Sequence, residues 1–136
     1  MTDIDAAISA AASGMRAQQT RMRIAAENIA NANSTGVNPN EDPFRRRIPL
    51  LESTTLASGA RGVRVEGAIN DMSQFREEYN PAHPAADDRG YVRLPNVDTL
   101  VEMMDMREAT RAYEANLNMI EAARTMTSRA LDLLRR

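Results

Sequence analysis

The sequence DIDAAISAAASGMRAQQTRMRIAAENIANA, residues 3–32, decides the fold. Two series with seven-residue spacing run through this stretch and alternate steps of three and four. The first series is Ile8, Met15, Met22 and Ile29, and the second is Ile4, Ala11, Gln18, Ala25 and Ala32. This spacing is typical of a coiled-coil seam, and alanine favours helix more than any other residue. We therefore predict one long helix with a narrow packing face.

A second and longer helix is predicted at the other end of the chain, over residues 97–134, which no glycine or proline interrupts. Helices of globular proteins average about 11–12 residues, so two such helices in one short chain suggest an antiparallel pair. Two heptad series are the candidates for its packing face. One is Met106, Tyr113, Ile120, Thr127 and Leu134, and its partner is Met103, Thr110, Leu117, Arg124 and Leu131.

The middle of the chain, residues 34–96, differs in kind because it holds all six prolines and five of the six glycines. Residues 62–69 alternate as a strand does, residues 45–51 are compatible with an extended segment, and residues 80–91 have turn chemistry throughout. The predicted fold is mainly α, with a small β- and loop-rich middle segment. Its predicted parts are an N-terminal helix (1–33), a middle segment with a short β-hairpin (34–96) and a C-terminal helix (97–136).

The apolar heptad residues are the predicted contacts of these helices, with each other and with neighbouring subunits. A pair of helices leaves apolar surface on its outer faces, which further copies can cover. The residues assigned to these seams are Ile8, Met15, Met22, Ile29, Met106, Tyr113, Leu117, Ile120, Leu131 and Leu134.

Composition argues against an enzyme and against a nucleic-acid-binding protein. The 17 basic and 19 acidic groups give a formal net charge of −2, whereas a polyanion-binding domain usually carries a basic patch. The one histidine, His83, lies between prolines and cannot form a metal cluster alone. Arg45, Arg46 and Arg47 form the one basic cluster, which we interpret as a solvated run. We predict no catalytic, cofactor-binding or metal-binding residues, no cofactor and no small-molecule substrate.

The N-terminus does not resemble a cleaved signal peptide, because Asp3 and Asp5 stand where positive charge is expected. No apolar run approaches the roughly 20 residues of a membrane span. If the protein leaves the cytoplasm, we expect a route that keeps its N-terminus.

Two segments resemble one known family. Residues 25–36, AAENIANANSTG, resemble the signature that ends the first helix of bacterial flagellar rod and hook axial proteins. Residues 108–116, EATRAYEAN, resemble the matching signature of the C-terminal helix. Residues 79–87, 90–97 and 102–106 are similar to the proximal rod members of this family.

This resemblance implies a non-enzymatic subunit of the flagellar basal-body rod, in which the terminal helices form a D0-type axial core domain. It implies helical assembly that transmits motor torque to the hook. It also implies synthesis in the cytoplasm, export by the flagellar type III apparatus and a final position in the periplasmic rod. The implied partners are other copies of the chain and the rod proteins FlgB, FlgF, FliE and FlgG.

The resemblance also assigns roles to single residues. Asn28, Asn31, Asn33 and Gly36 mark the signature at the helix end; the asparagines tie it to adjacent chains or cap it within one chain. Phe44 and Ile48 resemble the short aromatic-to-aliphatic element by which the export gate recognises rod and hook subunits.

The alternative interpretation is a soluble coiled-coil adaptor or secretion chaperone. Such a protein would be a stable helical dimer, whereas a rod subunit should be a monomer that completes its folding on assembly.

Overall fold

The computed structural model describes residues 2–136 of the chain. Met1, where the predicted N-terminal part begins, lies outside the described residues. The elements in chain order are helix α1 (Thr2–Ala30), strands β1 (Arg47–Thr55), β2 (Arg61–Asn70), β3 (Arg76–Tyr79) and β4 (Tyr91–Leu94), and helix α2 (Thr99–Leu134). The prediction of two long terminal helices around a strand-containing middle is confirmed.

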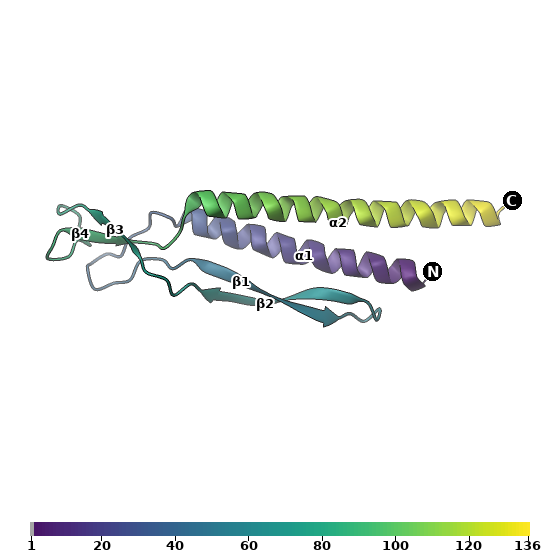
Figure 1. Cartoon of the computed structure of the whole chain (residues 1–136), viewed down its shortest axis with the longest axis horizontal. Helices are drawn as coiled ribbons and strands as arrows, with labels where there is room; N and C mark the ends of the chain where they lie inside the picture. The colour runs from purple at the N-terminus through teal and green to yellow at the C-terminus, as the bar shows by residue number, and fades with distance from the viewer. Residues whose placement is uncertain (1) are drawn as a thin grey trace.

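The molecule is elongated, and α1 is its central element (Figure 1). The helix α2 runs antiparallel to α1 along one side, and the hairpin of β1 and β2 lies along another side. Strands β3 and β4 form a separate pair at the end where α2 begins. The start of α1 and the end of α2 lie at the opposite end, where α2 extends past α1.

Small side chains bring the two helices close together. Ala25 on α1 and Ala109 on α2 are fully buried, and a Cβ at Gly14 would lie 2.7 Å from the side-chain nitrogen of Asn116. Asp98 fixes the start of α2, because its carboxylate accepts a hydrogen bond from the backbone nitrogen of Leu100 at 3.0 Å.

The leucines of the second series predicted for the face of α2 are exposed in the single chain, and their contact with a neighbouring subunit stays a prediction. Leu117 and Leu131 of the second series are 38% and 51% exposed. The buried residues of α2 are Glu102, Ala109 and Ala123, which share a seven-residue spacing with Asn116. Small residues occupy the face of α2 that contacts α1 because they allow the two helices to approach closely. A seam of methionine or leucine would hold the helices apart.

The hairpin of β1 and β2 is longer than the short hairpin predicted from the sequence. Its strands have nine and ten residues, paired antiparallel from Arg47 with Asn70 to Thr55 with Arg61. A bulge interrupts the register beside Leu50, opposite Gly67, whose φ of 125° suits glycine.

Ser13 attaches this hairpin to α1. Its hydroxyl accepts a hydrogen bond from the backbone nitrogen of Val63 at 3.1 Å and donates one to the carbonyl of Ala10 at 2.7 Å. The contact needs a glycine at position 62, because a Cβ there would lie 2.6 Å from both Ser13 Oγ and Leu56 Cδ1.

The pair of β3 and β4 was not predicted, because each strand has only four residues. The rings of Tyr79 and Tyr91 pack edge to face at 5.4 Å across the pair. His83 lies in the turn between the strands, where its Nδ1 accepts a hydrogen bond from the nitrogen of Ala85 at 3.0 Å. The one histidine is thus hydrogen-bonded within its own turn.

Candidate assembly surfaces and the polar node that positions them

A buried polar node joins both helices to the hairpin. Glu102 on α2 is 1% exposed, and its carboxylate accepts hydrogen bonds from Arg46, just before β1, and from Asn28 Nδ2 on α1 at 3.2 Å. A buried carboxylate is costly to desolvate unless it is paired and hydrogen-bonded. Both conditions hold here, so the node requires all three segments to be in place.

Asn28 holds the start of β1 against the end of α1. Its amide nitrogen donates to the carbonyl of Arg47, and its oxygen accepts from the nitrogen of Arg47, both at 2.9 Å. This arrangement reproduces the pairing that a neighbouring strand would offer. Asn28 is 1% exposed, so its hydrogen bonds are made within its own chain.

Asp71, just after β2, and Asn96, just before α2, complete the node at the same end of the hairpin as Arg46. Asn96 Oδ1 accepts from the nitrogen of Arg46 at 2.8 Å, and its amide donates to the carbonyl of Asp71 at 2.9 Å. Hydrogen bonds from Ser73 hold the pKa of Asp71 below its ordinary value, with a smaller contribution from Arg46. Burial alone would lower the pKa of Arg46, but Glu102 and then Asp71 raise it. Both shifts favour the charged forms of Asp71 and Arg46.

The basic run at residues 45–47 is not a solvated patch. Arg46 belongs to the node, and the guanidinium of Arg45 lies 4.1 Å from the centre of the Phe75 ring. Arg47 forms an ion pair with Glu27 at 3.2 Å. Each arginine has a partner in the same chain, so the run offers no free site for a polyanion.

The other signature residues shape the end of α1. Asn31 Nδ2 donates to the carbonyl of Glu27 at 2.9 Å, and Arg76 donates to the carbonyl of Ala32 at 2.8 Å. Together with the backbone hydrogen bond from the nitrogen of Asn31 to the carbonyl of Glu27 at 3.1 Å, these bonds hold the turn that follows α1. Gly36 is required by space, because a Cβ there would lie 2.5 Å from the carbonyl oxygen of Glu41. Asn33 is exposed, and its role toward an adjacent chain stays a prediction.

The predicted seam residues fall into two groups. Seven are half-buried, and part of their apolar surface is uncovered: Ile8, Met15, Met22, Ile29, Met106, Tyr113 and Ile120. Three are exposed: Leu117, Leu131 and Leu134. Within the chain, the tightest contacts are instead made by residues outside this set, among them Ala17, Ile24 and Glu102. Their signal in the sequence was weak, because alanine and a single glutamate do not stand out as core residues.

A row of large apolar side chains on α2 has no cover in the single chain. Its members are Val101 (49% exposed), Met104 (65%), Met119 (56%), Met126 (61%) and Leu133 (72%). We call these five residues the open stripe. Large exposed apolar side chains gathered on one helix are typical of an interaction surface.

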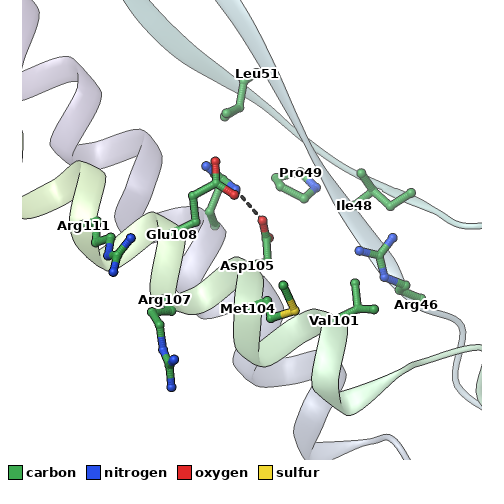
Figure 2. Close-up of a pocket in the computed structure, with 11 residues that line it drawn as sticks. Arg46, Ile48, Pro49, Leu51, Val101, Met104, Asp105, Arg107, Glu108 and Arg111 are labelled. Atoms are coloured by element: carbon green, nitrogen blue, oxygen red, sulfur yellow. Dashed lines mark hydrogen bonds and ion pairs between the residues drawn. The ribbon is translucent and has the colours of Figure 1, made fainter.

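The first two residues of the open stripe lie in a groove between β1 and α2, which we call the β1–α2 groove. It has a volume of about 870 Å³. Figure 2 shows Ile48, Pro49 and Leu51 on one side and Val101 and Met104 on the other. An ion pair between Arg21 and Asp105 joins α1 and α2 in this groove.

The predicted export element lies next to this groove. Phe44 precedes β1 and Ile48 lies within it, and both side chains are half-buried. The folded chain therefore covers part of both residues. An apparatus that passes an unfolded chain would meet them uncovered.

No helix within residues 2–136 is long and apolar enough to cross a membrane. In the same part of the chain, acidic and histidine side chains do not gather into a group that could hold a metal ion.

Comparison with known proteins gives matches at both ends of the chain and over its whole length. Residues 8–36 match the family model "Flagella basal body rod protein", and residues 88–133 match "Flagellar basal body rod FlgEFG protein C-terminal". The flagellar basal-body rod protein FlgC of Agrobacterium fabrum is 46% identical over 136 residues, covering 99% of this chain and 98% of that protein. The proteins of the same name from Aquifex aeolicus and Bacillus subtilis are 38% and 35% identical, with coverage of 97% and 93% of this chain and 98% and 95% of those proteins.

Proposed function

The chain belongs to the FlgC family of flagellar basal-body rod proteins, and from this premise we propose how its structure serves the rod. As a member of this family it is a structural subunit of the flagellar basal body, not an enzyme, and it serves motility. It assembles with other rod and basal-body components. The proposals below concern which surfaces it uses, which neighbours it meets and how it reaches the rod.

The open stripe is the observation that carries the proposed mode of assembly. Its side chains are between 49% and 72% exposed, and burying a large apolar side chain contributes about 1.5–3 kcal/mol. In the rod, neighbouring subunits cover this stripe together with the predicted contact residues Leu117, Leu131 and Leu134. Assembly then supplies the burial that the single chain lacks.

The layered fold suggests an orientation in the rod. The two terminal helices form the axial core, a D0-type domain that lines the inner tube, and the hairpin of β1 and β2 lies outside it. Long helices packed side by side resist twisting, because rotation would break many contacts at once. Such a helical tube can transmit torque from the motor to the hook.

We propose FlgB, FlgF, FliE and FlgG as neighbours in the rod, beside other copies of the chain. The chain is synthesised in the cytoplasm and exported by the flagellar type III apparatus without cleavage, and it ends in the periplasmic part of the basal body. This route agrees with the acidic first turn of α1, which carries Asp3 and Asp5.

Replacing Met119 and Met126 together by Glu tests the proposed interface. Both side chains are exposed, so the stability of the free chain should change by less than about 0.5 kcal/mol per site. Buried charges without partners should instead abolish rod assembly and swimming. Swimming in soft agar, and the amount of the protein in purified basal bodies, measure the effect.

The matched control places Glu at Asn118 and Thr125, one position earlier in each case and outside the open stripe. These exposed positions should tolerate the charge and leave swimming largely intact. Equal loss in both variants would mean that added charge on α2, not loss of the stripe, causes the defect.

Replacing Phe44 and Ile48 by Ala tests the export element. We expect secretion to stop while the cytoplasmic level of the protein stays unchanged, because the export gate no longer recognises the chain. Immunoblots of culture supernatant and cell pellet from a strain without hooks give the readout. Phe75→Ala, another half-buried aromatic, is the control, and undiminished secretion of the double variant would dispose of the idea.

A further inference from the structure

The β1–α2 groove contains positive charge that the chain does not neutralise. Arg107 and Arg111 line this groove, four residues apart on α2. Neither is among the arginines that form ion pairs within residues 2–136. Like charges at this spacing weaken a helix by about 0.2–0.5 kcal/mol. Glu108 also lines the groove and forms no ion pair within the described residues, so these three side chains leave one net positive charge. The apolar part of the lining includes Leu51 and Met104, which are exposed.

The start of α1 carries negative charge and apolar surface, which complement the β1–α2 groove. Asp3 and Asp5 are exposed acidic residues of the first turn, and neither forms an ion pair within the described chain. Ile4 and Ile8 beside them are half-buried. This end thus combines two free carboxylates with uncovered apolar surface.

The start of α1 is out of reach of the groove in its own chain. The ion pair of Arg21 with Asp105 places the groove beside residue 21 of α1. Asp5 lies 16 residues earlier, which is about 24 Å along a helix. The two surfaces can therefore meet only between two copies of the chain that are displaced along the long axis.

We infer that the first turns of α1 in one copy dock into the β1–α2 groove of the next copy. Asp3 and Asp5 pair there with Arg107 and Arg111, and Ile4 packs on Met104. The inference rests on the proposed function and specifies one contact within it. Such a contact joins different surfaces head to tail and does not close on itself, so it propagates as a helix.

A charge exchange tests the pairing. Arg107→Glu with Arg111→Glu should reduce the number of flagellated cells about tenfold, the effect of roughly 1.4 kcal/mol per contact. Adding Asp3→Arg and Asp5→Arg to the same chain should restore flagellation, because the attraction returns with reversed sign. A fourfold variant no better than the twofold variant would overturn the inference.

A disulfide test identifies the occupant of the groove, and it has no background because the chain has no cysteine. Asp5→Cys combined with Arg111→Cys should give covalent dimers or larger oligomers in oxidised basal bodies. The control pairs Asp5→Cys with Glu78→Cys on β3, an exposed position far from the groove, and should stay monomeric.

Each outcome separates this inference from the proposed function. If the protein is present in basal bodies but stays monomeric or links to a different rod protein, the self-contact is wrong and the rod function stands. If the wild-type protein is missing from basal bodies, the proposed function fails as well. Should the cysteine variants not enter the rod, the charge exchange decides the matter.

Discussion

Replacing Glu102 by Ala is expected to lower the free energy of unfolding by about 3 kcal/mol. The side chain is 1% exposed and bonds Arg46 and Asn28. Without it, the three-quarters-buried guanidinium of Arg46 and the buried side-chain amide of Asn28 each lose a hydrogen-bond partner. The loss should be at the lower end for a broken buried ion pair, since Arg46 keeps Asp71 at 3.5 Å.

Urea unfolding of the purified chain, followed by circular dichroism, measures this loss. Glu102→Gln keeps the shape and one acceptor, so it should cost less than Glu102→Ala. Glu108→Ala is the matched control, because Glu108 is an exposed glutamate of the same helix and should change stability by less than about 0.5 kcal/mol. Equal effects at positions 102 and 108 would contradict a stabilising node.

Replacing Gly62 by Val is expected to cost about 2 kcal/mol through overpacking. The first added carbon would already lie 2.6 Å from Ser13 Oγ and from Leu56 Cδ1. Ser13 is on α1, so the hairpin has to move away from the helix. That movement also breaks the hydrogen bond from Val63 to Ser13.

Hydrogen exchange of the Val63 amide reports this change locally. It should become about 30-fold faster, the equivalent of 2 kcal/mol in local opening. Arg61→Val is the control, since it adds the same β-branched side chain at an exposed position of the same strand. Unchanged protection of Val63 in the Gly62 variant would show that the hairpin accommodates the side chain.

The structural signals that the sequence did contain were local ones. Heptad spacing and alanine content predicted both helices, and the asparagine-rich stretch at residues 28–36 predicted where the first helix ends. Local signals also located the strand at residues 62–69. The four-residue strands β3 and β4 were not predicted, because their pairing depends on contacts across the turn between them and not on a pattern within each strand.

The candidate site was predicted only in part. Asn28 was singled out as a signature residue, yet its partners Arg47 and Glu102 are 19 and 74 positions away along the chain. Arg46 was assigned to a solvated run because a cluster of arginines in a loop usually is one. A buried glutamate at a seam position has no local signature, since its burial depends on a guanidinium from another segment.

The sequence by itself determined that this chain has two long amphipathic helices, where each one lies and which family it belongs to. Only the tertiary structure decided which face of α2 meets α1. That helix carries apolar residues on several faces, and periodicity ranks them equally. Packing distinguishes these faces, because Ala109 and Ala123 let the two helix axes approach, whereas Met119 and Met126 would hold them apart. The larger residues are therefore left outside, where in the proposed rod a neighbouring subunit covers them.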